Sequence, residues 1–208
     1  MINLFWNNDK WEISTKTSVG GNVSFFTIEK SLSASKENTF RYMFEDAIKY
    51  YDKNLSIDNL LNSDNNEMKK CCFSFVLQHP SNRIVVPFTK PNIYLVAIYN
   101  INNFNISRVD ITEYFKSALP EFIKYPKIYT NFNNYNDIIN EFTNCDYKTV
   151  GIMITNKSTF NRTKIRNQNY EKVKLLRGNQ PKLQYRYLTL CQSKQITEYL
   201  FYYPEQKE

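Results

Sequence analysis

The stretch CCFSFVLQHPSNRIVVPFTKPNIYLVAIYNI, residues 71–101, is the most strongly patterned part of the sequence. It contains three runs rich in β-branched and aromatic residues, which are separated by HPSN at 79–82 and TKPN at 89–92. β-Branched and aromatic residues favour strands that are at least half buried, whereas Pro, Asn and Ser favour turns. The stretch therefore predicts three consecutive strands of a buried antiparallel sheet.

The segments on either side predict a mixed architecture. Residues 1–21 are typical of a β-hairpin that turns at the polar NND and closes at two glycines. Residues 37–51, ENTFRYMFEDAIKYY, carry apolar residues at helical spacing, and Asn38 or Thr39 is suited to cap that helix. Shorter helices are predicted at 56–62, at 111–119 after a capping Asp110 and at 136–142, a strand at 148–156, and a helical tail at 185–203. Together these elements predict one α+β domain with helices at its periphery.

Residues 159–179, TFNRTKIRNQNYEKVKLLRGN, combine a cationic strand with a basic helix. Residues two apart in a strand point to the same face, so Arg162, Lys164 and Arg166 should project together. The NQN triplet then turns the chain into a basic amphipathic helix that ends at Gly178. Cations grouped in this way suggest a bound anion. Alternatively, they form the solvent face of an edge strand, where cations discourage aggregation.

The composition is that of a globular protein with a moderate excess of positive charge. Lys and Arg outnumber Asp and Glu by 27 to 20, giving a formal charge of +7. This excess favours a polyanionic partner such as RNA or a nucleotide, although a solvated basic surface has the same composition. No signal peptide opens the chain, and no apolar run approaches the roughly 20 residues that a membrane span needs. We therefore expect a soluble, intracellular and cytoplasmic protein with no membrane partner.

The cysteines and the single histidine do not suggest a metal site. None of the four cysteines belongs to a C-x-x-C pair, and a structural zinc site needs four well-spaced ligands. Adjacent Cys71 and Cys72 suit buried thiols in a reducing compartment. His79 stands beside Pro80 in a predicted turn, where we expect it at the surface.

The string FSFVLQHPSNRIV, residues 73–85, resembles a strand of the RNA ligase family of the T-even phage type, in which F-E-F-V is followed by P-x-N-R-I-V. Further segments resemble family elements in the same order. They are WEISTKTS for an early strand that ends near K-G-S, TFRYMFEDAI for the first helix, KTVGIMITN for the E-G-Y-V strand and TKIRNQNY for the K-I-K strand. The resemblance runs from Met1 to about residue 176. It implies an N-terminally truncated, RNA ligase-like nucleotidyltransferase domain at 1–176 and a helical C-terminal extension at 177–208.

What the resemblance implies is an ATP-grasping fold with an antiparallel β core. In the family, a lysine within K-x-D-G attacks the α-phosphate of ATP and becomes a lysyl-adenylate, and the AMP then passes to a 5′-phosphate on RNA. Finally, a 3′-hydroxyl displaces the AMP. This chemistry needs a nucleophilic amine of lowered pKa, a divalent metal such as Mg²⁺ held by carboxylates, and cations that neutralise phosphate charge.

The sequence departs from the family at three of these positions. The K-x-D-G lysine is absent, and by spacing it should lie a few residues before Met1, on a preceding or partner segment. Ser74 replaces the glutamate of F-E-F-V, and Val150 replaces the glutamate of the E-G strand. Lys164 matches the first lysine of K-I-K, Arg166 replaces the second, and Lys16 matches the lysine of the early strand.

The resemblance therefore implies a degenerate ligase-like domain that binds nucleotide or RNA phosphates, without ligation activity on its own. Lys16, Lys164 and Arg166 are the expected phosphate ligands, with ATP and Mg²⁺ as implied cofactors. Arg83 and Arg162 are further candidates for RNA contact, and Arg83 could instead pair with a buried carboxylate. No catalytic residue and no metal ligand is assigned.

Two other functions remain open from the sequence. The chain could be the distal part of a split or mis-started ATP-dependent RNA ligase that a K-x-D-G segment completes. It could also be a structural or virion-associated protein on a ligase-derived fold, located in a host cytoplasm or a virion. The Asn-, Lys-, Ile- and Tyr-rich composition is typical of AT-rich genomes, and similar ligase-like chains occur in large DNA viruses.

Overall fold

The computed structural model describes residues 1–24, 39–62, 64–179 and 182–207. The chain forms two compact units. Unit 1 comprises Met1–Asn82 and Phe88–Lys127, and unit 2 comprises Arg83–Pro87 and Ile128–Glu208. Apart from Arg83–Pro87, the units divide after residue 127. Residues 128–176 therefore share a unit with the C-terminal helices. The end of a ligase-like domain near residue 176 stays a prediction.

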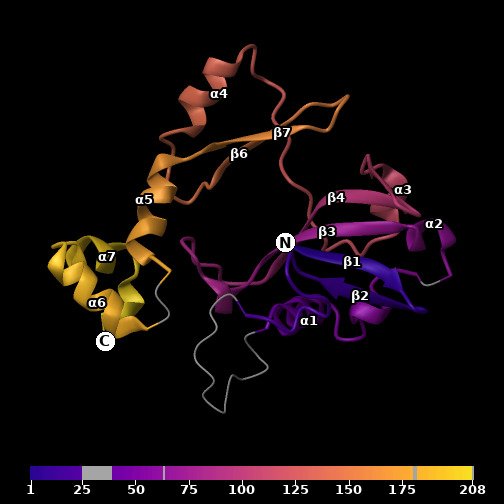
Figure 1. Ribbon diagram of the computed structural model, residues 1–208, viewed down its shortest axis with the longest axis horizontal. Coiled ribbons are helices and arrows are strands. Elements are labelled where there is room, and N and C mark those ends of the chain that lie inside the picture. Colours follow the sequence, from indigo (N-terminus) through magenta and orange to yellow (C-terminus); the bar gives the residue numbers. More distant parts are fainter. Residues whose placement is uncertain (25–38, 63, 180–181, 208) are drawn as a thin grey trace. The chain divides into compact units, whose positions relative to one another are not determined.

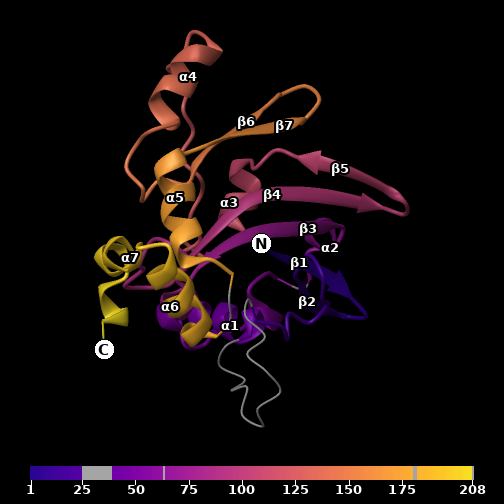
Figure 2. The ribbon, with the colours of Figure 1, turned by 60° about the vertical axis from the view of Figure 1, so that its left-hand side comes forward.

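Unit 1 is built on an antiparallel sheet with the strand order β2-β1-β3-β4-β5. Figure 1 labels the first four of these strands and Figure 2 also labels β5. The two central ladders of the sheet pair Leu4 with Phe73 and Phe73 with Ile98. In the β3–β4 pair, the register shifts between Ser74 and Phe75, which marks a β-bulge. The strands are β1 (Ile2–Asn7), β2 (Lys10–Ser14), β3 (Cys71–Gln78), β4 (Asn92–Asn102) and β5 (Asn105–Val109).

The predicted N-terminal hairpin is confirmed, whereas the second hairpin of unit 1 was not predicted. Asn8 and Asp9 link β1 to β2 with φ angles of 45° and 63°, which two-residue hairpin turns require and which Asn and Asp tolerate. Asn103, with φ of 53°, begins the turn from β4 into β5 (Figure 2). β5 reads NISRV and is mostly exposed. It therefore lacks the dense apolar run by which the other strands are recognised.

Helices cover one face of this sheet and complete its core. α1 (Phe40–Tyr51) packs Phe44 against Phe75 of β3, with ring centroids 5.7 Å apart. α3 (Glu113–Ser117) packs Phe115 against Phe73 at 6.2 Å. Both β3 rings are fully buried, and each such burial contributes roughly 1.5–3 kcal/mol. Alternate residues of β3 thus hold the helices to the sheet.

The helix boundaries agree only in part with those expected. Thr39 caps α1, because its hydroxyl accepts a hydrogen bond from the Tyr42 N–H, while Asn38 lies outside the described residues. Thr112, not Asp110, stands at the N-cap of α3. The helix expected at 56–62 is only a 3-10 turn, η2 (Ile57–Asn59), and the short helix α2 (Asn66–Lys69) was not predicted.

The prediction that the middle run of the 71–101 stretch is a strand is wrong. Residues 80–82 form the 3-10 turn η3 (Pro80–Asn82), and residues 83–87 form no strand. Instead, Val85 is buried in the core of unit 2, among residues that follow it by more than 80 positions. The apolar run therefore contributes to a core, but not to the sheet.

His79 is also not at the surface, as its turn-like context suggested. It is 5% exposed, and its Nε2 lies 3.0 Å from Asp46 Oδ2 on α1. Its Nδ1 accepts a hydrogen bond from the Ser81 N–H at 3.2 Å, so Nε2 carries the proton that Asp46 accepts. The histidine ties the end of β3 to α1.

Unit 2 combines a two-stranded antiparallel sheet with helices. The cationic strand, the basic helix and the helical tail that the sequence predicts are all confirmed. The apolar core of unit 2 consists of Val85, Tyr170, Val173, Leu176, Leu190, Tyr199 and Tyr203. The elements are α4 (Tyr135–Phe142), β6 (Gly151–Thr155), β7 (Arg162–Arg166), α5 (Gln168–Arg177), α6 (Leu183–Gln192) and α7 (Ile196–Tyr202).

Candidate anion-binding site

The three cations predicted on one strand face do share a face of β7. Arg162, Lys164 and Arg166 are exposed, whereas Ile165 between the last two is 9% exposed. They stand opposite Thr155, Met153 and Gly151 of β6. Alternate residues of a strand are about 6.7 Å apart, so the hairpin presents a row of three evenly spaced positive side chains.

Gly151 allows the two strands of this hairpin to meet. Its φ angle is +131°, and a Cβ at this position would lie 2.2 Å from the carbonyl oxygen of Ile165. Only glycine adopts this backbone conformation without strain. The glycine therefore brings the start of β6 against the end of β7, beside Arg166.

Asn167 fastens this same end of β7 to the loop that precedes β6. It is fully buried, and its side-chain amide donates to the carbonyl oxygens of Cys145, Asp146 and Thr149 at 3.1, 2.7 and 2.8 Å. Its Oδ1 accepts the Asn169 N–H at 3.0 Å and so caps α5. One side chain thus sets where the cationic strand ends and the basic helix begins.

Acidic side chains neutralise only part of this positive charge. Glu171 Oε2 lies 3.4 Å from Arg166 and 3.5 Å from Lys174, so one carboxylate serves two cations. Lys172 pairs with Glu198 at 2.7 Å, and that hydrogen bond raises the pKa of Lys172. For Arg162 and Lys164, the described residues include no carboxylate within ion-pair distance.

The formal charge of the chain is concentrated in unit 2. This unit holds 13 of the 27 Lys and Arg residues but only 7 of the 20 Asp and Glu residues. It therefore carries a formal charge of +6, and unit 1 carries the remaining +1. The excess of cations noted in the sequence is a property of one unit and not of the chain as a whole.

Arg83 does not present its guanidinium group as a free phosphate ligand. Nη1 lies 2.6 Å from Glu205 Oε1, Nη2 donates to the Tyr202 carbonyl at 2.6 Å, and Nε donates to the Val85 carbonyl at 3.1 Å. The guanidinium carbon also lies 4.7 Å from the centre of the Tyr203 ring. The alternative that Arg83 pairs with a carboxylate is the arrangement observed, although Glu205 is half-exposed.

Two other predicted positions, Lys16 and Ser74, belong to unit 1. Lys16 is exposed on the bend that follows β2. Ser74 is 2% exposed on β3, and its hydroxyl donates to Asn3 Oδ1 at 2.7 Å. Val150 in unit 2 is exposed just before β6, and its carbonyl accepts the Asn167 N–H. Neither Ser74 nor Val150 supplies a carboxylate for Mg²⁺, so these positions do not fit the metal that the resemblance implies.

The helical part of unit 2 holds a second group of arginines, which the sequence did not reveal as a group. Arg83 lies over the ring of Tyr203, and Tyr203 stacks on Tyr199 with ring centroids 4.9 Å apart. Arg186 lies over the far end of this column, 5.9 Å from the centre of the Tyr199 ring. Burial lowers the pKa of Arg177, and the positive charge of the nearby Arg186 lowers that pKa further.

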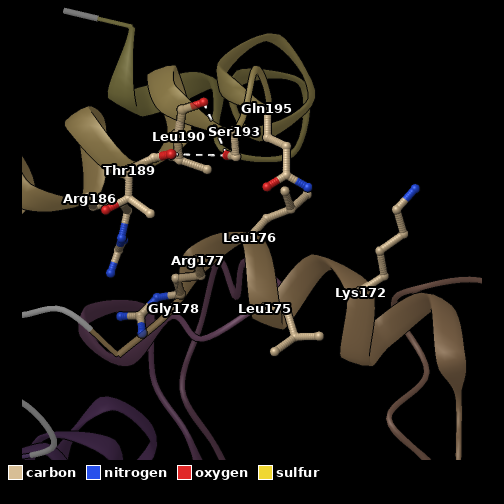
Figure 3. A pocket seen from close by; sticks show the side chains of 10 residues that line it. All are labelled: Lys172, Leu175, Leu176, Arg177, Gly178, Arg186, Thr189, Leu190, Ser193 and Gln195. Carbon is tan, nitrogen blue, oxygen red and sulfur yellow. Dashed lines mark hydrogen bonds between the residues drawn. The ribbon is translucent and has the colours of Figure 1, made fainter.

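A cavity of about 290 Å³ opens beside Arg177 and Arg186 (Figure 3). The two guanidinium groups lie on one side of it, and they come from the end of α5 and from the facing helix α6. The other lining residues are Lys172, Leu175, Leu176, Gly178, Thr189, Leu190, Ser193 and Gln195. None of the described residues that line the cavity is acidic, so this lining is electropositive.

Among the described residues, no group of three His, Cys, Asp or Glu side chains is placed to hold a metal ion. In the same part of the chain, no helix is both long enough and apolar enough to cross a bilayer. No protein-family model matches the sequence, and no curated protein is similar enough to count as a match. The cations of unit 2 can neutralise the negative charge of a bound anion. One set lies along the open β6–β7 hairpin and the other lines a cavity.

Proposed function

We propose that this chain binds the phosphate groups of RNA or nucleotides through unit 2. We further propose that it is a degenerate RNA ligase-like nucleotidyltransferase domain, which does not ligate on its own. The observation that carries the proposal is the row of Arg162, Lys164 and Arg166 on the exposed face of β7, in a unit whose formal charge is +6.

The row suits a chain of phosphates better than a single small anion. Its members are spaced about 6.7 Å apart along an open strand face, so each can approach a different phosphate. Arg162 and Arg166 offer planar donor forks that can bind phosphate oxygens bidentately, whereas Lys164 acts as a point charge. A sequence-independent, salt-sensitive interaction is expected from contacts of this kind.

The proposed absence of ligation follows from the residues at the motif positions. The sequence contains no Asp-Gly pair, so it contains no K-x-D-G motif. Ser74 donates its hydroxyl within the sheet, and Val150 is apolar. The two positions at which the resemblance implies metal-holding carboxylates therefore carry none in this chain, whereas Lys164 and Arg166 stand at the positions of phosphate-holding cations.

The test is the salt dependence of binding to a labelled single-stranded RNA. Replacing Arg162, Lys164 and Arg166 together with Ala should weaken binding and reduce the slope of log K against log salt by about 2, since each single-strand phosphate contact contributes roughly 0.7. A matched variant replaces exposed Lys10, Lys53 and Lys90 of unit 1 with Ala, which removes the same charge elsewhere. If both variants lose RNA affinity equally, the loss reflects only the lower net charge and not contacts made by β7. An unchanged salt slope in the β7 variant would refute the proposal.

A further inference from the structure

The cavity between α5 and α6 differs from the β7 row in being concave and partly apolar, and one of its two arginines, Arg186, is already held in place. Arg186 is 8% exposed, its Nη1 lies 3.4 Å from the Tyr199 hydroxyl, and its guanidinium group lies over the Tyr199 ring. Because Tyr199 is itself stacked on Tyr203, Arg186 is positioned before any ligand arrives. Preorganised donors lose less entropy on binding.

Two like charges held together favour an anion between or beside them. Arg177 ends α5 and Arg186 lies on the facing helix, and the pKa of Arg177 is lowered by its burial and by Arg186. An anion in the cavity would offset both effects, because it interacts favourably with both guanidinium groups. A dianionic, tetrahedral oxyanion suits two guanidinium forks better than a monoanion does.

The remaining lining indicates that the ligand has an organic body. Leu176 and Leu190 supply apolar surface, and the Gln195 side chain lies beside them in Figure 3. The volume of about 290 Å³ is larger than a single oxyanion needs, and it lies at the lower end of the range for small-molecule sites. We propose that this cavity is a binding site for a small phosphomonoester, whose phosphate is held by Arg177 and Arg186 and whose body contacts the leucines.

This proposal concerns the same unit as the proposed RNA-binding function but different residues, so the two can fail separately. The β7 row and the cavity lining have no residue in common. The variant that lacks Arg162, Lys164 and Arg166 should therefore retain phosphomonoester binding. If that variant loses binding to RNA and to the phosphomonoester alike while remaining folded, the cavity is not an independent site.

The experiment is a calorimetric titration of the full chain with ribose 5-phosphate, with inorganic phosphate and ribose as separate probes. We expect ribose 5-phosphate to bind more tightly than inorganic phosphate and ribose not to bind. Gln195→Glu places a carboxylate of nearly the same shape in the cavity, at a residue that is exposed and precedes α7. It should weaken ribose 5-phosphate binding at least tenfold and leave the far-ultraviolet circular dichroism unchanged.

Two further variants test whether the weaker binding of ribose 5-phosphate arises from the cavity itself. Gln184→Glu carries the same change to an exposed position in the first turn of α6, outside the cavity lining, and should bind within twofold of the original chain. Arg186→Lys keeps the charge but removes the fork, and should weaken binding about tenfold. The proposal is overturned if ribose 5-phosphate does not bind, if ribose binds equally well, or if Gln195→Glu binds as the original chain does.

Discussion

Arg83 and Glu205 form an ion pair with a 2.6 Å separation between Nη1 and Oε1, although 122 positions separate them in the chain. The pair joins the short segment Arg83–Pro87 to the C-terminal end of unit 2. The Tyr203 hydroxyl strengthens this attachment, because it donates to the Ile84 carbonyl at 2.9 Å. Arg83 thus has the structural, carboxylate-paired role that the sequence offered as the alternative to phosphate contact.

Arg83→Met should destabilise unit 2 without changing its affinity for RNA. The variant loses three hydrogen bonds and the contact with Tyr203, so we expect the free energy of unfolding to fall by about 2–4 kcal/mol. Glu205→Gln should cost only about 0.5–1 kcal/mol, because this carboxylate is half-exposed. Urea unfolding measures both, and RNA titrations measure the salt slope. A folded Arg83 variant whose salt slope falls by roughly 0.7 would show that Arg83 contacts a phosphate.

Gly151→Ala should be more destabilising than Gly178→Ala. Both glycines have positive φ angles, so alanine is strained at each. At Gly151, the added Cβ would also meet the Ile165 carbonyl oxygen at 2.2 Å, whereas at Gly178 its nearest neighbour is 3.8 Å away. We expect a loss of about 2–4 kcal/mol for Gly151→Ala and about 1–2 kcal/mol for Gly178→Ala, measured by urea unfolding. Equal losses would mean that the β6–β7 hairpin does not make this close approach.

The stability of unit 2 should fall as the pH rises above 10. Burial raises the pKa of Tyr203 to about 12 from its ordinary value of 10.0. Between these values the unfolded chain releases the phenolic proton while the folded chain keeps it, so stability is complete below pH 10 and is lost as the pH approaches 12. The loss is on the order of 2 kcal/mol. Tyr203→Phe should lower stability at neutral pH by about 1 kcal/mol, and its further decline above pH 10 should be visibly smaller in pH-dependent urea melts. A decline identical to that of the original chain would contradict the assignment to Tyr203.

Restoring both carboxylates should not restore ligase chemistry. Ser74→Glu together with Val150→Glu returns the motif glutamates but supplies no K-x-D-G lysine. Incubation with α-labelled ATP and Mg²⁺ or Mn²⁺, resolved on a denaturing gel, should show no labelled protein for the original chain or for the double variant. A labelled band from the original chain would reveal another nucleophilic lysine and refute the proposal of an inactive domain. Ser74 is buried, so Val150→Glu alone, at an exposed position, serves as the variant in which we expect the fold to be retained.

Local sequence patterns anticipated much of the fold because they report local geometry. The Asn8-Asp9 turn, the alternation around Ile165 and the end of α5 at Gly178 each depend on residues within a few positions of one another. The same patterns failed where local appearance and tertiary environment differ. Residues 83–87 look like a strand, yet Val85 lies in the core of unit 2, and His79 looks like a turn residue, yet it is buried against Asp46.

The sequence by itself determined that Arg162, Lys164 and Arg166 share one face, because strand periodicity alone sets which side chains point together. It also determined the net charge, but not that unit 2 carries nearly all of it. Only the tertiary structure decided that Arg83 is engaged by Glu205 and that Arg177 and Arg186 face one cavity. The physical reason is that these relations arise from long-range packing, in which helices and loops distant in the chain bury their apolar faces together. The periodicity of a helix or strand shows which of its side chains share a face, but it does not indicate which other element packs against that face.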